Sequence, residues 1–515
     1  MTTQLREATV GSLLEAAAHR RPDGTALQWP TPTGLASLTW QQVHRRATAA
    51  AARLRSCSNS RAPVAIWAPN SDGWYVSMWA VALSGRPLVP INPALTESEL
   101  VTVLTDCGAS TLLAARDYRD RCLIDEVRAV KPQLPDVNEI WDVDRWPADA
   151  LSLDAAADVA ISPRGTFLIQ YTSGTTGTPK GAVLSHRACV DAAYTMIPGL
   201  EPGDDEVCCS PLPLHHIGAL VAHALALACI AGTYVMLSDF SAPQFVEAAA
   251  QSRATILGGV PTVYLRVLDE LPDVQLPDVR VLMLGGSSIP PALVTQLEHH
   301  FDARVSIMYG QSEAPAISQT RLDDSASVKA NTVGRALPHR ELRIVSPTTG
   351  ANADVGQAGE ICVRTAVRMD RYLNRPEATS AAIDKDGWLH TGDLGSLDCE
   401  GLLRFHGRLR DMIVRGGENI YAREVENAIE AHPDVAQAVV VGLPDARWGE
   451  SVAAAVVPSA GADLREEDLT AVVAQRLAHY KRPTRWHIVD DLPMTASGKP
   501  QKFKIIEALM EANDE

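Results

Sequence analysis

Short apolar runs alternate with alanine-rich segments of helical periodicity along most of the chain. The runs at 63–67, 255–257 and 281–284 are rich in Val, Ile and Leu, as buried strands are. Strands that alternate with helices predict layered α/β architecture with largely parallel sheets.

The pattern changes between residues 341 and 364. Residues 342–345 and 360–364 alternate polar and apolar side chains, which is typical of half-exposed antiparallel strands. We expect a small β-barrel-like subdomain here, at the end of a large N-terminal domain built of layered α/β subdomains.

A charged, glycine-containing segment at 407–411 precedes a compact tail. The tail has helical patterns at 423–432 and 466–480 and strand patterns at 437–441 and 452–457. About a hundred residues suffice for a small α+β domain. We therefore predict an N-terminal domain over 1–409, a C-terminal domain over 411–515 and a boundary at Arg410.

Length, charge and cysteine content limit the class of protein. A chain of 515 residues exceeds one ordinary core, so two or more domains are expected. The net charge of −16 and the lack of a basic block argue against nucleic-acid binding. Nine cysteines without metal or disulfide spacing, and an N-terminus without a signal-peptide pattern, indicate a cytoplasmic location.

One nearly continuous apolar stretch, 219–237, is about as long as a membrane span. His223 interrupts it, Gly232 breaks it near its end, and no basic flank follows. We predict a buried helix followed by a strand, and no membrane span.

Residues 171–180 read YTSGTTGTPK and carry the clearest chemical signal in the chain. Glycines let the backbone approach a ligand closely, while hydroxyl groups and exposed N–H groups bind anions. Lys180 adds a positive charge, and the apolar residues 167–169 lead into the loop as a buried strand would. We interpret it as a phosphate-binding loop of a type other than the Walker motif, rather than as a flexible linker.

This loop resembles the signature loop of the adenylate-forming superfamily, which includes acyl- and aryl-CoA synthetases, peptide-synthetase adenylation domains and beetle luciferases. Further family motifs follow in order: GGSS at 285–288, YGQSE at 309–313, WLHTGD at 388–393 and PMTASGK at 493–499. The resemblance covers nearly the whole chain. It implies the fold outlined above, with a mobile C-terminal domain, and it implies ATP and Mg²⁺ as ligands.

The resemblance assigns roles around the nucleotide. Glu313 and Thr172 would hold Mg²⁺, the Tyr309 ring would stack near adenine, and Asp393 with Arg408 would contact the ribose. Ser312 replaces the more usual Thr but keeps the hydroxyl. The residues assigned to nucleotide and metal are Thr172, Ser173, Gly174, Thr175, Thr176, Gly177, Lys180, Gly285, Gly286, Ser287, Tyr309, Gly310, Gln311, Ser312, Glu313, Asp393 and Arg408.

Three residues are assigned to catalysis by the same resemblance. Lys499 is the expected catalytic lysine, whose ammonium group would bridge the attacking carboxylate and the α-phosphate. Arg410 occupies the hinge position, where Lys or Asp is commoner. His216 occupies the gate of the acyl pocket, with a core histidine as the alternative.

The expected acyl pocket is lined by His216, Gly218, Val260, Met308 and Ala314. The resemblance is nearest to benzoate- and chlorobenzoate-type CoA ligases. Met308 stands where coumarate ligases tend to have glycine, so its side chain would shorten the pocket. We expect a compact aromatic or small cyclic acid. Amino-acid-activating domains have an Asp soon after the gate segment, whereas this chain has none there. An amino-acid substrate is therefore not expected.

The acceptor is expected to be CoA. Gly416 and Gly417 belong to a loop that resembles the pantetheine tunnel, and Trp448 matches a position that stacks the CoA adenine. Lys481 and Arg482 lie where a 3′-phosphate contact could occur. Interface packing for Trp448 and simple solvation for the basic pair are the alternatives.

The sequence therefore predicts an ATP-dependent acid–CoA ligase that forms an acyl-adenylate and then a thioester. The alternatives are transfer of the acyl group to an amine or to a carrier protein. A catalytically silent scaffold is a further alternative, against which the intact Lys180, Glu313 and Lys499 argue. We expect a monomer or a homodimer.

Overall fold

The computed structural model describes residues 5–57, 61–146, 159–172, 179–286, 289–416, 418–445, 447–459, 461–494 and 500–511. Their contacts divide the chain into two compact units. Unit 1 comprises Met1–Glu341 and Val363–Leu389, and unit 2 comprises Leu342–Cys362 and His390–Glu515. The division at Arg410 stays a prediction, because the contacts group strands on both sides of that residue in unit 2.

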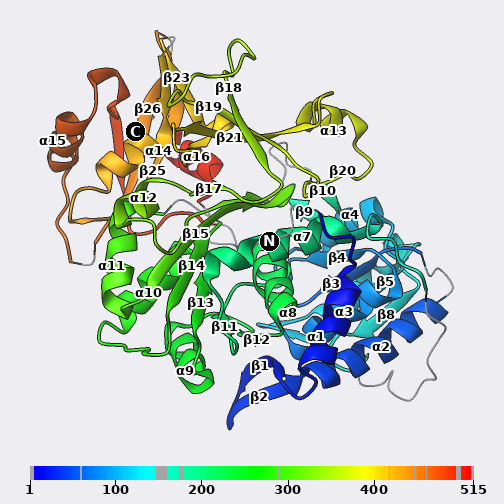
Figure 1. Cartoon of the computed structure of the whole chain (residues 1–515). Helices are drawn as coiled ribbons and strands as arrows, with labels where there is room; N and C mark the ends of the chain where they lie inside the picture. Colours follow the sequence, from blue (N-terminus) through cyan, green and yellow to red (C-terminus); the bar gives the residue numbers. More distant parts are fainter. Residues whose placement is uncertain are drawn as a thin grey trace. The chain divides into compact units, whose positions relative to one another are not determined.

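One sheet of unit 1 has seven described strands and lies near the N-terminus of the chain (Figure 1). Its strands in spatial order are β20 (Arg371–Tyr372), β10 (Lys180–Ser185), β9 (Thr166–Thr172), β4 (Leu88–Ile91), β3 (Val64–Trp67), β5 (Thr111–Ala114) and β8 (Glu139–Asp142). The neighbouring strands β9, β4, β3, β5 and β8 are parallel to one another, whereas β10 and β20 are antiparallel to their neighbours. The strands predicted at 63–67 and 167–169 are confirmed.

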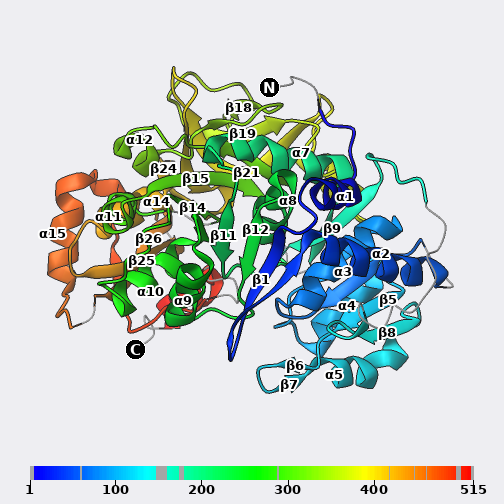
Figure 2. The same ribbon diagram turned by 60° about the horizontal axis from the view of Figure 1, so that its bottom comes forward.

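A second sheet of unit 1 has nine described strands, and Figure 2 shows β1 beside β12 within it. Its order is β17 (Arg335–Ala336), β16 (Ala314–Gln319), β15 (Arg304–Gln311), β14 (Val281–Gly285), β13 (Ile256–Gly259), β11 (Val207–Ser210), β12 (Thr233–Met236), β1 (Thr25–Thr31) and β2 (Gly34–Thr39). The neighbouring strands β15, β14, β13, β11 and β12 are parallel to one another. Their carboxyl ends therefore meet at one edge, where α/β proteins bind ligands.

Helices cover these sheets. Those of unit 1 are α1 (Val10–Arg20), α2 (Trp40–Ser56), α3 (Asp72–Ser84), α4 (Glu97–Cys107), α5 (Leu123–Val130), α7 (His186–Met196), α8 (Ala226–Ile230), α9 (Ala242–Ser252), α10 (Pro261–Glu270), α11 (Pro291–Phe301), α12 (Ala326–Asn331) and α13 (Pro376–Ala382). In Figure 1, α9, α10 and α11 line one side of the β11–β15 strands, and a continuous apolar core joins the two layers.

The apolar stretch 219–237 forms a π-helix, Gly218–Leu225, then α8, then β12. The predicted buried helix and strand are confirmed, and the π-helical geometry is an addition. Within the part of the chain that the structure describes, no helix has the length and hydropathy that crossing a bilayer requires.

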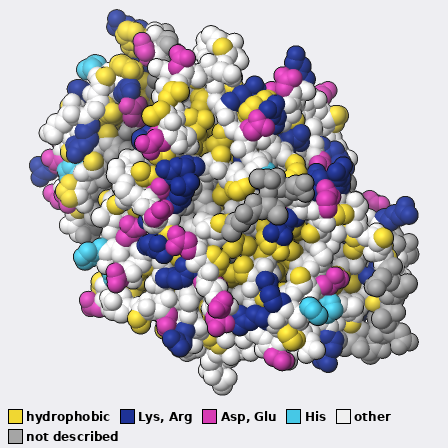
Figure 3. All heavy atoms as spheres, in the orientation of Figure 1, with side chains coloured by type: hydrophobic (Ala, Val, Ile, Leu, Met, Phe, Trp, Pro, Cys, Tyr) yellow, Lys and Arg dark blue, Asp and Glu magenta, His cyan; other side chains and the backbone are white. Residues whose placement is uncertain are grey.

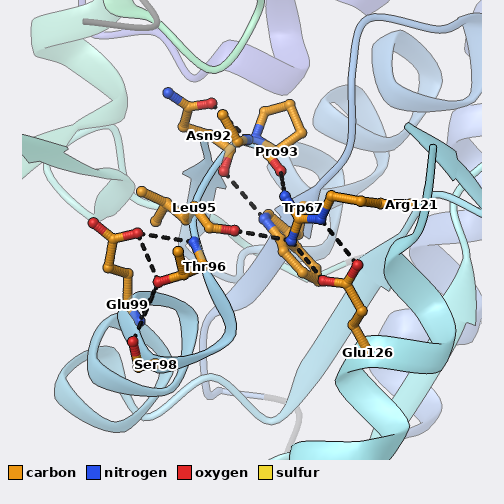
Figure 4. Close-up of polar contacts among 10 residues, drawn as sticks. Trp67, Asn92, Pro93, Leu95, Thr96, Ser98, Glu99, Arg121 and Glu126 are labelled. Atoms are coloured by element: carbon orange, nitrogen blue, oxygen red, sulfur yellow. Dashed lines mark hydrogen bonds and ion pairs between the residues drawn. The ribbon is translucent and has the colours of Figure 1, made fainter. Parts of the chain in front are cut away.

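Polar contacts fix the loop that connects β4 to α4 (Figure 4). Arg121, on β7 (Arg121–Cys122), which pairs with β6 (Asp117–Tyr118), donates to the carbonyls of Pro93 and Leu95 and pairs with Glu126. Thr96 then begins α4 as a capping box with Glu99, as Thr at an N-cap favours.

Unit 2 contains a four-stranded sheet in the order β18 (Glu341–Val345), β19 (Gly359–Arg364), β21 (Trp388–Leu397) and β22 (Leu403–Arg408). This open sheet is the small β-subdomain expected from the alternating pattern. The strands predicted at 342–345 and 360–364 are confirmed.

The rest of unit 2 is a sheet of β24 (Glu418–Tyr421), β23 (Met412–Arg415), β26 (Gly449–Pro458), β25 (Val435–Asp445) and β27 (Arg485–Ile488), with helices α14 (Ala422–Ile429), α15 (Glu466–Arg476) and α16 (Lys502–Glu511). Successive side chains of β25 lie on opposite faces of the sheet and belong to two different apolar cores. Val440 joins the core that contains α14 and α15, and Val439 joins the core that contains α16. The α+β character predicted for the tail is confirmed.

On the face shown in Figure 3, the Lys and Arg side chains are interspersed with Asp and Glu. All nine cysteines are free thiols.

Candidate active site

The phosphate-binding motif joins two antiparallel strands. Thr172 ends β9 and pairs with Lys180, which begins β10. The Thr172 hydroxyl donates to the Lys180 carbonyl at 3.4 Å. Residues 173–178 of the motif lie outside the described residues, so the structure places its two ends.

Tyr372 connects the motif lysine to the predicted metal ligand. Its strand, β20, pairs with β10, and its ring centroid lies 5.6 Å from Lys180 Nζ. Its hydroxyl donates to Glu313 Oε1 at 2.7 Å. Burial, reinforced by the Glu313 charge, raises the pKa of Tyr372, so the phenol stays protonated and remains a donor. The sequence analysis missed Tyr372, because no motif in the neighbouring sequence identifies it.

Ser312 and Glu313 form the tight turn between β15 and β16. Gln311 pairs with Ala314, which leaves the two motif residues at the hairpin tip. Gly310 is required here, because a Cβ at this position would lie 2.5 Å from the Ala316 backbone nitrogen. The turn is fixed on its other side by the Met369 N–H, which donates to the Glu313 carbonyl at 2.6 Å.

Glu313 fits a hard cation. Its carboxylate is half-buried, and among the described residues Tyr372 is its only side-chain hydrogen-bond partner. The remaining lone pairs are open to a ligand, and Mg²⁺ prefers carboxylate and phosphate oxygens. The Glu313 carboxylate therefore fits the metal that the sequence predicts, and Thr172 as a second contact stays a prediction.

Four residues predicted to contact the nucleotide or the acid lie at the carboxyl ends of β13, β14 and β15: Val260, Gly285, Gly286 and Met308. Gly285 ends β14 and pairs with Met308 of β15. Gly286 has φ +77°, and a Cβ there would lie 3.5 Å from Val260 Cγ1. Tyr309 is 8% exposed on the neighbouring position of β15. Ser287 lies outside the described residues.

The gate segment is held by two amides that the sequence analysis did not select. Asn70 bonds the backbone of Leu212, Leu214 and Leu237, and Gln170 donates to the His215 carbonyl. The rings of His215 and His216 lie 4.5 Å apart. Burial, with a smaller effect of His216, lowers the pKa of His215 well below its usual value. His215 is therefore neutral at neutral pH, and His216 begins the turn that leads to Gly218.

In unit 2, Asp393 and Arg408 pair across β21 and β22. Their Oδ1 and Nε atoms lie 3.5 Å apart, Asp393 is 5% exposed, and Arg408 is more open. Strand pairing and the neighbouring guanidinium hold the carboxylate in a fixed orientation, which suits recognition of a ribose diol.

Glu360 braces the part of β21 that carries Asp393. Its Oε1 accepts from the Gly392 N–H at 3.0 Å, and its Oε2 lies 2.7 Å from His390 Nδ1. Thr391 adds a bond to the Ile361 carbonyl and accepts from the Asp393 N–H. The sequence analysis missed Glu360 as well.

Glu360, Cys362 and His390 offer ligand atoms within 4.8 Å of one another. The Glu360–His390 separation of 2.7 Å has the length of a hydrogen bond. We therefore interpret the group as part of the polar contacts between β19 and β21 rather than as a metal centre.

Two residues predicted to contact CoA are brought together in unit 2. Gly416 has φ +59° and donates to the Trp448 carbonyl at 2.7 Å. A Cβ at Gly416 would lie 2.8 Å from Trp448 Cε3, so the glycine lets the indole lie against the loop. Trp448 is 43% exposed, which leaves ring surface for stacking. Gly417 lies outside the described residues.

The predicted basic pair, Lys481 and Arg482, makes contacts within unit 2. Lys481 pairs with Glu424 at 2.6 Å, and Arg482 donates to the carbonyls of Leu477 and Ala474 at the end of α15.

The predicted hinge residue, Arg410, lies in a 3₁₀ turn, Leu409–Asp411, and its Nε is 3.5 Å from Asp411 Oδ1. Lys499 lies outside the described residues.

Comparison with known proteins agrees with this geometry. A family model described as AMP-binding enzyme matches residues 14–373, and one described as AMP-binding enzyme C-terminal domain matches residues 424–499. The chain belongs to this family of adenylate-forming enzymes. The resemblance drawn from the motifs is thereby confirmed.

Two curated relatives are CoA ligases. One is the 3-[(3aS,4S,7aS)-7a-methyl-1,5-dioxo-octahydro-1H-inden-4-yl]propanoyl:CoA ligase of Rhodococcus jostii (strain RHA1), 34% identical, with 96% of this chain and 97% of the relative covered. The other is the mitochondrial medium-chain acyl-CoA ligase ACSF2 of Homo sapiens, 31% identical, with 98% and 88% covered.

Among solved structures, ATP-bound MatB from Rhodopseudomonas palustris superposes with a TM-score of 0.87. It is 27% identical, and the match covers 97% of this chain and 99% of MatB. The predicted fold class is confirmed, with a large N-terminal and a small C-terminal domain. The protein is an AMP-forming acid–CoA ligase that works through an adenylate.

Proposed function

We propose that the acid is a compact aromatic or small cyclic carboxylic acid. One observation carries this proposal: Val260, Gly286 and Met308 lie at the carboxyl ends of adjacent parallel strands, and Met308 is on the strand that leads into the Glu313 turn. These residues would bound a short pocket beside the nucleotide. The Rhodococcus jostii relative, whose name specifies a bicyclic propanoyl group, supports an acid of this kind.

In the first step, an oxygen of the acid attacks the α-phosphorus of ATP, and pyrophosphate leaves. Lys180 would face the phosphates, and Lys499 would offset the negative charges that meet in the transition state. Glu313 and Thr172 would hold Mg²⁺, whose charge offsets that of the phosphates when it is bound. Asp393 and Arg408 would hold the ribose, and Tyr309 with Gly285 and Gly286 would enclose the adenine.

In the second step, the thiol of CoA attacks the acyl carbon, a thioester forms and AMP leaves. The C-terminal part would turn about Arg410 between the steps and present Gly416 and Trp448 to CoA. The exposed indole beside a glycine loop supports this assignment. We place the reaction in the cytoplasm, in keeping with nine free cysteines.

The test is pyrophosphate release and product mass spectrometry on a panel of acids. The panel runs from benzoate and small cyclic acids to cinnamate-like acids, long straight-chain acids and amino acids, each with CoA, an amine, a phosphopantetheine carrier protein or no acceptor. We expect CoA thioesters with compact acids. Thioesters formed with long acids alone would overturn the substrate proposal, and amides without thioesters would overturn the acceptor.

The Met308→Ala variant sharpens the test. Removing the thioether from the end of the pocket should raise activity with longer aromatic acids relative to benzoate. An unchanged ratio, with activity retained, would show that Met308 does not bound the acid.

A further inference from the structure

A small apolar cavity, with a volume of about 20 Å³, lies in unit 1 between the π-helix with α8 and the strands β11, β13 and β14. Its lining includes Cys208, Ala222, Ala226, Ile230, Ile256 and Met283. His223 contributes the only nitrogen-containing side chain of that lining. None of these residues belongs to the nucleotide site described above.

The cavity lies on the elements that carry the acyl residues. Side chains two apart along a strand share a face. Ile256 is therefore on the face of Gly258, and Val260 follows at the strand's carboxyl end. On the π-helix, Ala222 follows Gly218 by about one turn, and a Cβ at Gly218 would meet open space. The cavity therefore lies further from the carboxyl end of β13 than Gly258, by about 7 Å of strand.

His223 lies between the two spaces. A Cβ on Gly258 would lie 2.5 Å from His223 Cε1 and 3.2 Å from Ser210 Cβ, so the imidazole occupies the volume above this glycine. The ring is 3% exposed, and it packs near Tyr234 with centroids 6.3 Å apart. It blocks the face of β13 between Val260 and Ile256.

The ring is held by packing rather than by a polar network. Among the described residues, His223 Nδ1 has no hydrogen-bond partner. Burial lowers the pKa of His223 to about 4, so it is neutral at physiological pH. A neutral, unpartnered imidazole in an apolar wall can be replaced by an apolar side chain without leaving a buried partner unsatisfied.

We propose that His223 forms the inner wall of the acyl site, sets the maximum length of the acid, and separates that site from an unused apolar extension. This inference rests on the proposed function, since it takes Gly218, Val260 and Met308 as the acyl pocket. Replacing His223 would admit acids that are longer by the space of the removed ring and of this small cavity.

The experiment measures kcat/KM for CoA thioester formation with benzoate and with the straight-chain acids from butanoate to dodecanoate. In His223→Ala, the optimum should move to longer acids, with a gain of about fourfold for each methylene that enters the cavity. His223→Phe keeps the ring volume and should keep the wild-type profile. His223→Ala combined with Ala226→Phe refills the cavity and should reverse the gain.

His186→Ala is the matched control. His186 is also a buried histidine whose pKa burial lowers to about 4, but it lies on α7 and does not line the cavity. Its variant should leave the length profile unchanged. If His223→Ala does not fold, His223→Val keeps more of the packing and should give a smaller shift in the same direction.

The outcomes separate the two proposals. An active His223→Ala or His223→Val enzyme with the wild-type length profile would overturn this inference alone. A wild-type enzyme that already prefers long acids would overturn the proposed substrate class and, with it, the role of His223.

Discussion

The two sites that carry the predicted nucleotide carboxylates are built in different ways. In unit 1, Glu313 is at the tip of a hairpin, half-buried, and accepts one hydrogen bond from the neutral Tyr372 phenol. In unit 2, Asp393 lies within strand β21, is 5% exposed and is beside the Arg408 guanidinium, and Glu360 accepts a hydrogen bond from the neighbouring Gly392.

The difference matches the ligands expected at each site. A carboxylate that holds a cation needs lone pairs left over, and a charged protein partner would compete for them. A carboxylate that binds two hydroxyl groups needs a fixed orientation, which strand pairing and the neighbouring arginine supply. Four substitutions test this contrast.

Glu313→Gln should have the largest effect. The neutral amide offers one weakly binding oxygen in place of a carboxylate, so we expect adenylation to fall by about a hundredfold or more and to require more Mg²⁺. Pyrophosphate release measured against Mg²⁺ concentration checks this. An unchanged Mg²⁺ dependence would remove Glu313 from the metal site.

Asp393→Ala should raise the KM for ATP by about tenfold or more and leave the KM for the acid nearly unchanged. The carboxylate would make two charge-assisted hydrogen bonds to the ribose, each worth about 1.5–3 kcal/mol. Steady-state kinetics with each substrate varied in turn provide the measurement. A loss confined to the acid would place Asp393 in the other pocket.

Tyr372→Phe tests whether the Tyr372 hydroxyl supports Glu313 as a metal ligand. The ring that faces Lys180 is kept and only the hydroxyl is lost, so we expect about a tenfold loss of apparent Mg²⁺ affinity, as for other residues that orient a metal ligand. Tyr118→Phe, on the short hairpin of β6 and β7, is the control and should behave as wild type. Equal Mg²⁺ affinities in all three proteins would refute the role of Tyr372.

Glu360→Gln should have the smallest effect, about threefold in the KM for ATP, because the amide oxygen can still accept from the Gly392 N–H while the charge beside His390 is lost. A positioning role predicts little change in kcat. A fall in kcat with a constant KM for ATP would mean that Glu360 acts in the chemistry instead.

Much of the fold could be predicted from the chain. Apolar runs at 63–67 and 281–284 became buried parallel strands, and alternation at 342–345 became an edge strand of an antiparallel sheet. The apolar stretch 219–237 became a buried helix and strand rather than a membrane span. These signals are local, because periodicity reports which face of an element is buried.

The order of the site motifs could also be predicted, but their supporting residues could not. Tyr372 reaches Glu313 only because β20 pairs with β10, and Glu360 reaches Gly392 only because β19 lies beside β21. Neither residue has a sequence signature of its own. The functions of Lys499, Arg410 and the CoA residues remain predictions of the motif pattern.

The chain by itself determined which short segments would be strands, helices and ligand-binding turns, since those depend on neighbours a few residues away. Tertiary structure alone decided that Tyr372 supports Glu313, that Glu360 braces Asp393, and that His223 covers Gly258. Each of these contacts joins residues more than thirty positions apart. Strand pairing and core packing create such contacts, and no local periodicity records them.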